Sequence, residues 1–185
     1  MAAGLHLARL RCTGCGECCR GPRVPVTFAD LGRLARATGL PAEELVDWGA
    51  PELLAGEPSS VVLLPSGRAI MLLRWNDGGC RFLDGAACGV HASRPAACRA
   101  YPLHATFGER GGLKRLRVLR ELDCPYELDG TDTLAAVRRD HAMLRSELGE
   151  HHAALREWNR AQERRRRLGK RLAPASELFQ RYVRA

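Results

Sequence analysis

Four cysteines within eight residues, at Cys12, Cys15, Cys18 and Cys19, constrain this chain more than any other feature. The first three recur at intervals of three residues, and glycines stand in the spacers between them. Two-residue spacers let sulfur atoms converge on one centre while the backbone turns its amides toward them. The same opening holds iron–sulfur clusters in bacterial ferredoxins. The segment therefore predicts a metal centre that contains zinc or iron.

A second set of cysteines lies further along the chain, with His91 in its midst. Thiolate and imidazole groups suit tetrahedral zinc or iron, whereas magnesium and calcium prefer oxygen ligands. We leave His91 out of the ligand set, because a single histidine beside a structured motif is more often a hydrogen-bonding residue. The predicted metal ligands are Cys12, Cys15, Cys18, Cys19, Cys80, Cys88, Cys98 and Cys124.

The adjacent pair Cys18 and Cys19 bears on the number of metal centres. Neighbouring side chains in an extended or turning backbone point in different directions. The two thiols are therefore expected to serve two different centres, or one bridged polynuclear centre, and the sequence leaves both open. The predicted cofactor is zinc or iron, with a [4Fe–4S] cluster as one form of the iron.

The expected location is the cytoplasm. The first ten residues, MAAGLHLARL, lack the apolar stretch of roughly 7–15 residues that a secretory signal needs. No run approaches the roughly 20 apolar residues that span a bilayer, so we expect no contact with a membrane. Thiols stay reduced in the cytoplasm, and a cysteine-rich chain there is more often a metal or redox protein than a disulfide framework.

The sequence predicts an α+β fold with an irregular cysteine-rich core, short hairpins and flanking helices. A Ser/Thr-type cap at Thr27 and a glycine at Gly39 delimit the clearest helix. The glycine- and cysteine-bearing stretch 77–90 is expected to form loops. The predicted helices are 29–38, 41–48 and a short one from 94 that Ser93 caps and residues 101–102 end, and the predicted hairpins pair 60–64 with 68–74 and 103–107 with 113–122.

The chain changes character after residue 130. Helical spacing of apolar residues predicts helices over 134–148 and 150–168, and a short helix after Pro174. Residues 132–185 hold thirteen Lys and Arg against seven Asp and Glu. We therefore divide the chain into a cysteine-cluster metal-binding domain, 1–130, and a basic helical extension, 131–185, that packs on it. The extension is expected to be a solvated surface or to meet a protein partner, because few aromatic residues accompany its arginines for nucleic-acid binding.

The cysteine motifs, taken together, resemble a known family. They read Cys12-x2-Cys15-Gly16-x-Cys18-Cys19-Arg20, then Cys80-x-Phe82-Leu83, then Cys88-x-Val90-His91-x2-Arg94-Pro95-x2-Cys98-Arg99-x-Tyr101-Pro102. This order is similar to that of the CxxCxxCC cysteine-cluster family, also called the YkgJ-type zinc- or iron-chelating domain, over roughly residues 10 to 125. All the cysteines above except Cys124 match motif positions, whereas His91 stands where many relatives have tyrosine.

The resemblance implies metal binding and brings no defined reaction. Members are often labelled iron–sulfur oxidoreductases, and a related cluster occurs in flagellin lysine methylases. We therefore expect a metal-binding protein with a redox or metal-handling role. The alternatives are an iron-dependent enzyme, or component of a protein-lysine methylation system, and a structural zinc module with a basic tail that binds nucleic acid or protein. The sequence points to no catalytic residue.

Two arginines flank Cys98 and suggest a supporting role. Guanidinium groups of Arg94 and Arg99 close to thiolates would offset their negative charge through charge-assisted hydrogen bonds. In the competing interpretation, Arg94 pairs with a carboxylate such as Asp84 and only fixes the loop.

Overall fold

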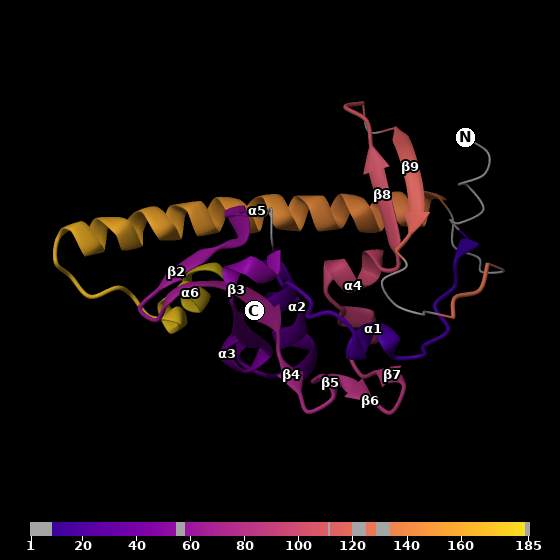
Figure 1. Ribbon diagram of the computed structural model, residues 1–185, viewed down its shortest axis with the longest axis horizontal. Helices are drawn as coiled ribbons and strands as arrows, with labels where there is room; N and C mark the ends of the chain where they lie inside the picture. Colours follow the sequence, from indigo (N-terminus) through magenta and orange to yellow (C-terminus); the bar gives the residue numbers. More distant parts are fainter. Residues whose placement is uncertain (1–8, 55–57, 111, 120–124, 129–133, 184–185) are drawn as a thin grey trace.

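A computed structural model describes residues 9–54, 58–110, 112–119, 125–128 and 134–183. The chain combines helices with small antiparallel sheets, so the expected α+β class is confirmed. In Figure 1 the long helix α5 (Leu134–Arg167) runs along the whole molecule. The three-stranded sheet lies beneath one end of α5, and the cysteine-bearing elements lie beneath the other end.

Helix α2 (Phe28–Thr38) agrees closely with the prediction. The Thr27 side chain accepts a hydrogen bond from the Asp30 amide, and the Asp30 carboxylate accepts one from the Thr27 amide. This capping box satisfies two amides that the first turn of a helix leaves unpaired. Gly39, at φ 71°, ends the helix in the left-handed conformation that glycine adopts without steric cost.

The three-stranded sheet has the order β1-β3-β2 and is antiparallel throughout. Strands β2 (Val62–Leu64) and β3 (Gly67–Leu73) form the predicted hairpin. Helix α3 (Ala42–Leu45) is shorter than the predicted helix 41–48, because β1 (Val46–Gly49) pairs with β3 instead. Val46 is only 2% exposed, and its β-branched side chain suits a strand that packs on the core.

The prediction of two helices over 134–148 and 150–168 is wrong, because α5 is a single helix of 34 residues. Gly149, which marked the expected break, lies inside the helix and faces solvent. Packing holds the helix straight through this position: its first half contacts α4 (Ala96–Ala100) and β8 (Leu103–Phe107), and its second half contacts β2. The predicted helix after Pro174 is confirmed as α6 (Ala175–Tyr182).

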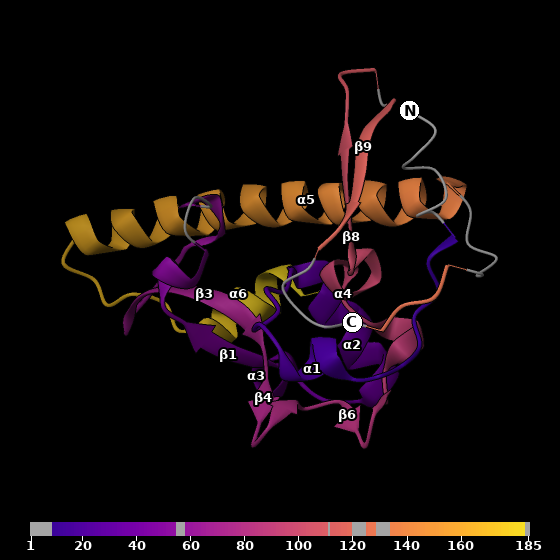
Figure 2. The same ribbon diagram turned by 45° about the vertical axis from the view of Figure 1, so that its right-hand side comes forward.

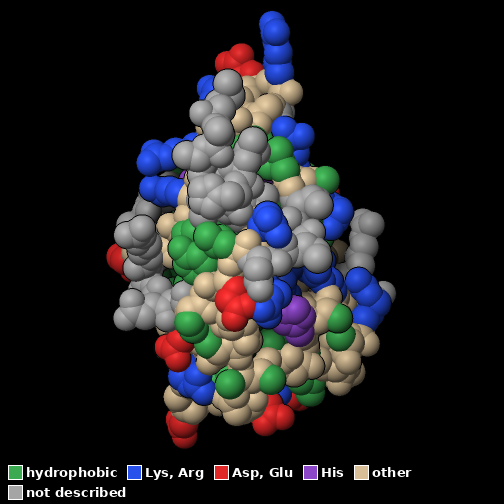
Figure 3. All heavy atoms as spheres, turned by 90° about the vertical axis from the view of Figure 1, so that its right-hand side faces the viewer, with side chains coloured by type: hydrophobic (Ala, Val, Ile, Leu, Met, Phe, Trp, Pro, Cys, Tyr) green, Lys and Arg blue, Asp and Glu red, His purple; other side chains and the backbone are tan. Residues whose placement is uncertain are grey.

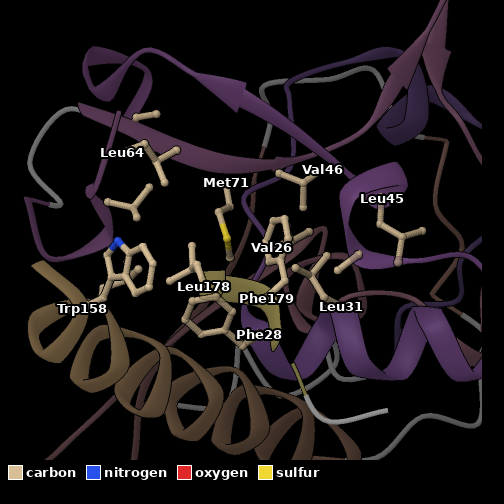
Figure 4. Packing of buried hydrophobic residues seen from close by; sticks show 14 of the residues in the cluster. Val26, Phe28, Leu31, Leu45, Val46, Leu64, Met71, Trp158, Leu178 and Phe179 are labelled. Atoms are coloured by element: carbon tan, nitrogen blue, oxygen red, sulfur yellow. The ribbon is translucent and has the colours of Figure 1, made fainter. Parts of the chain in front are cut away.

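The main core lies between the sheet and the helices α2, α5 and α6. In Figure 4, Leu31 of α2 and Met71 of β3 lie in the same cluster as Leu178 and Phe179 of α6, and Val26 joins them from the segment that precedes α2. Trp158 of α5 closes one side of the core and donates a hydrogen bond from Nε1 to the Leu63 carbonyl. Residues on both sides of position 130 therefore share this core, while the division into domains at that position stays a prediction.

Smaller elements carry the second set of cysteines. The stretch 77–90, predicted to form loops, holds three two-residue strands. They are β5 (Gly79–Cys80), which pairs with the preceding β4 (Trp75–Asn76), and β6 (Leu83–Asp84), which pairs with β7 (Ala87–Cys88). Helix α4 begins at Ala96 after Pro95, so the expected Ser93 cap is wrong. The remaining elements are α1 (Glu17–Arg20), β9 (Leu113–Val118) and the 3₁₀ turns η3 (Pro51–Leu54), η4 (Pro58–Ser60) and η5 (His91–Ser93).

The hairpin β8–β9 is confirmed as far as Val118, and its predicted end at Leu122 lies outside the described residues. It crosses α5 and projects beyond it (Figure 2). Lys114, Arg115 and Arg117 are exposed on β9, and basic side chains mark the hairpin end of the face in Figure 3. No helix among the described residues is long and apolar enough to cross a membrane.

Candidate metal centre

The amino-terminal cysteines lie on a turn that ends in the one-turn helix α1. Gly16 precedes this helix at φ 78°, a conformation that favours glycine. A Cβ at this position would lie 3.1 Å from the Ala86 carbonyl oxygen, so the turn approaches the β6–β7 ladder closely. Arg20 reinforces the contact by donating a hydrogen bond of 2.6 Å to the Gly85 carbonyl. The first cysteine cluster is therefore held directly against the second.

A second glycine, Gly79, allows strand β5 to approach the backbone of α1 closely. A Cβ at Gly79 would lie 2.8 Å from the Cys19 carbonyl oxygen, a distance that side chains do not tolerate against backbone. The strand β5 can therefore pass beneath α1 only with glycine at this position. The next residue, Cys80, is brought within hydrogen-bonding reach of Cys19.

Seven of the predicted ligands line one cavity, which measures about 100 Å³. The eighth, Cys124, lies outside the described residues. All seven are free thiols. They come from the amino-terminal turn with α1, from β5, from β7 and from α4. The seven are Cys12, Cys15, Cys18, Cys19, Cys80, Cys88 and Cys98.

Cys18 and Cys19 do not diverge as the sequence predicted. Their sulfur atoms lie 4.0 Å apart within the one-turn helix α1, although neighbouring side chains of a helix do not usually face each other. Two sulfurs bound at about 2.3 Å to one tetrahedral zinc ion would lie about 3.8 Å apart. The spacing of the pair therefore matches what one metal ion requires, and the geometric argument for two separate centres is lost.

The thiols strongly influence one another's ionisation. The hydrogen bond with Cys19 and burial raise the pKa of Cys18 far above its ordinary range. The hydrogen bond with Cys18 lowers the pKa of Cys19, but the bond with Cys80, burial and neighbouring thiols outweigh it and raise the pKa to about 11. Burial and the nearby thiols raise the pKa of Cys98 to about 12.

Cys80 is the exception, since the hydrogen bond with Cys19 lowers its pKa. Cys80 therefore loses its proton more readily than Cys18, Cys19 or Cys98. A bound cation would offset the charge of the others, so that metal binding displaces their protons.

The described thiols line the same cavity, but they are not arranged around a single metal position. Among the described residues, no group of three cysteine, histidine or carboxylate side chains has the positions needed to hold a metal ion. The donor set fits zinc or iron in its chemistry, because soft thiolates are the ligands that these metals share. Binding by these thiols would require some of their sulfur atoms to come closer together than they lie here.

His91 and Arg94 also line the cavity and interact with each other. Arg94 donates a hydrogen bond to Nε2 of His91 and does not form the ion pair with Asp84 that the competing interpretation predicted. Burial and the charges of Arg94 and Arg99 lower the pKa of His91. Arg94 also acts on the thiols, since its charge opposes the rise in the pKa of Cys18. Arg99 instead donates to the carbonyls of Ala92 and Arg94 and fixes the loop.

A family model described as a "putative zinc- or iron-chelating domain", CxxCxxCC, matches residues 11–124, which is more than half of the chain. The chain belongs to the CxxCxxCC family. The resemblance read from the cysteine motifs is thereby confirmed. No curated protein and no solved structure matches the chain.

The CxxCxxCC domain has a supporting residue whose role the sequence did not reveal. Asp30, 1% exposed, accepts a hydrogen bond of 2.8 Å from the amide of Ala96, at the start of the helix that carries Cys98. Arg33 also donates to Asp30, and it binds both carboxylate oxygens of Glu147 on α5 at 2.8 and 3.0 Å. The acid at the third position of a capping box was visible in the sequence, but its bond to α4 depends on the tertiary structure.

Proposed function

We propose that this chain is a metal-binding protein that holds zinc or iron through its clustered cysteines, with a redox or metal-handling role. One observation supports it most directly: cysteines from four separate segments line the same cavity. Apolar burial alone does not explain this arrangement, since none of the seven thiols belongs to the fully buried core. The proposed ligands are those seven cysteines and Cys124.

The number of thiols favours more than a single four-coordinate ion. Four thiolates satisfy one tetrahedral zinc ion or one [4Fe–4S] cluster. Eight cysteines would serve two such centres, or one bridged centre that uses most of them. The 4.0 Å spacing of Cys18 and Cys19 fits two thiols of one centre, and it is compatible with the bridged arrangement, in which both bind neighbouring or common metal atoms.

Arg94 would support such a centre from within the cavity. A four-thiolate site carries excess negative charge, and a guanidinium group nearby reduces it through charge-assisted hydrogen bonds. The hydrogen bond to His91 fixes the direction of Arg94, while the two bonds from Arg99 hold the backbone beneath it. In this proposal Arg94 and Arg99 tune and position the centre, and His91 is not a ligand.

The decisive experiment is zinc, iron and acid-labile sulfide analysis, with an absorption spectrum, on protein purified without oxygen. Iron with sulfide and a band near about 400 nm would identify an iron–sulfur protein. About one or two zinc ions per chain without sulfide would identify a structural or metal-handling zinc protein. Protein that contains neither metal, and takes up neither when they are added anaerobically, would overturn the proposal.

Substitutions test whether the cysteines that line the cavity bind the metal. Cys15→Ser and Cys88→Ser are expected to weaken metal binding by more than the roughly tenfold that loss of an outer-shell partner costs. The matched control is His152→Gln, which changes a metal-binding type of residue that lies outside the cavity and contacts Ser60. Equal metal content in all three variants would exclude the cysteines as ligands.

A further inference from the structure

A second cavity, of about 370 Å³, lies against the other side of the cysteine cluster. Helices α4 and α5 and strand β8 form its walls. Cys18 and Cys98 line both cavities, together with Val24 and Tyr101, so the two cavities share part of one wall. The volume falls within the range of pockets that bind small molecules, about 300 to 1,000 Å³.

The described residues that line the second cavity are mostly apolar, and their polar side chains are positive or neutral. Leu103, Leu144 and Leu148 are among the apolar ones, and neither Asp nor Glu is among the described lining residues. Arg145 lies at its edge with the guanidinium carbon 4.9 Å from the centre of the Phe107 ring, and it forms no ion pair with another described residue. A molecule with an apolar body and a negative group would match both properties.

His141 supplies an independent sign of a ligand. It lines the cavity, is only 7% exposed, and its Nε2 atom has no hydrogen-bond partner among the described residues. A buried polar atom without a partner costs about 1 to 3 kcal/mol, so such atoms usually meet a ligand or an ordered water. Burial and the neighbouring His104 and Arg145 lower the pKa of His141, which leaves a neutral imidazole that can donate one hydrogen bond.

We propose that this cavity binds a small organic carboxylate, whose apolar body lies against the leucines of α5 and β8 and whose carboxylate meets Arg145 and His141. Arg23 is also among the described residues that line the cavity, but it is already paired with Asp47 and is assigned no role. The bound molecule would lie next to Cys18 and Cys98. The inference goes beyond metal binding and does not depend on it, because no residue that recognises the carboxylate is a proposed metal ligand.

The test is a calorimetric titration of the full chain with 4-phenylbutyrate. Its neutral analogue 4-phenylbutanamide and free acetate serve as comparison ligands. We expect 4-phenylbutyrate to bind at least about tenfold more tightly than either, because only this probe has both an apolar body and a charge. Equal binding of the amide would show that the positive groups play no part and would overturn the proposal, as would the absence of binding.

Variants place the probe in the cavity. Arg145→Gln is expected to weaken 4-phenylbutyrate binding about tenfold, and His141→Leu several-fold, through the lost charge-assisted and neutral hydrogen bonds. Arg156→Gln, an exposed arginine of the same helix outside the cavity, is the matched control. Unchanged affinity in Arg145→Gln and His141→Leu, with circular dichroism like that of the parent, would overturn the proposal.

The same titration separates this inference from the proposed metal site. Cys15 lines the cysteine cavity and not the second cavity. Cys15→Ser should therefore lower metal content and leave the affinity for 4-phenylbutyrate within about twofold of the parent. If the protein binds the probe but neither contains nor takes up metal, only the proposed metal site is refuted. If it contains metal but does not bind the probe, only the proposed carboxylate site is refuted.

Discussion

The main core and the cysteine cavity are neighbours that are ordered by different forces. In the core, Leu31, Leu155 and Leu178 are completely buried, and long elements pack on one another. Around the cavity, the strands β4 to β7 have two residues each, and no described cysteine is fully buried. Apolar burial supplies the free energy that orders the core. The cavity has little such burial, so its order is expected to depend on bonds between thiolates and metal.

Removal of the metal is the strongest test of this comparison. Anaerobic chelation is expected to lower the free energy of unfolding by about 4 kcal/mol, the stabilisation by a ligand at a thousand times its Kd. Hydrogen exchange should accelerate in segments 12–20 and 75–90 and stay slow in β3. Equally large acceleration in β3 would show that the core also depends on the metal.

Truncation of a core side chain tests the opposite dependence. Leu178→Ala should lower the free energy of unfolding by about 3 kcal/mol, because it removes a fully buried side chain and leaves a cavity. Metal content per folded chain should not change. Urea unfolding measures the effect, with Leu168→Ala, at a leucine that is 64% exposed, as the control. A loss below about 1 kcal/mol would show that α6 adds little to the core.

Asp30 connects the two regions, so its replacement should affect both. Asp30→Asn keeps the size of the side chain but removes the charge that Arg33 meets and weakens the bond to the Ala96 amide. We expect a loss of about 2 kcal/mol in the free energy of unfolding, typical of hydrogen bonds to charged groups. Metal affinity should fall as well, because α4 positions Cys98. Lower stability with unchanged metal affinity would contradict the connection.

Acid should destabilise the core through His151. Burial lowers the pKa of His151 to about 3, whereas the unfolded chain holds a proton on this side chain below about 6.5. The contribution of neutral His151 to the free energy of unfolding is therefore complete above pH 6.5 and is lost as the pH falls toward 3.

At pH 5.5 the loss relative to neutral pH should be about 1 kcal/mol. In His151→Leu this part of the acid sensitivity should disappear, while His152→Leu, at a partly exposed neighbour, should retain it. The measurement is urea unfolding of metal-free protein at pH 7.5 and 5.5. Identical pH dependence in the parent and in His151→Leu would contradict the assignment.

The sequence correctly predicted the helices and strands whose ends are marked by caps or turn residues in the sequence itself. The helix 28–38 has its cap, acid and terminal glycine in the sequence, and the hairpin of β2 and β3 has two β-rich runs around a turn. Two of the wrong helix boundaries arose where tertiary contacts outweigh such signals. Val46–Gly49 forms a strand because β3 offers it an edge, and Gly149 does not break α5 because both halves of the helix pack on other elements.

The sequence by itself determined the membership of the CxxCxxCC family, because the spacing of the cysteines is sufficient to identify it. It also predicted soft thiolate ligands from residue type. It did not determine that seven cysteines face one cavity, that Cys18 and Cys19 lie 4.0 Å apart, or that Asp30 holds the helix of Cys98. It also gave no sign of the second cavity. These features join residues that are distant in the chain, and only the packing of helices and strands around the core brings such residues together.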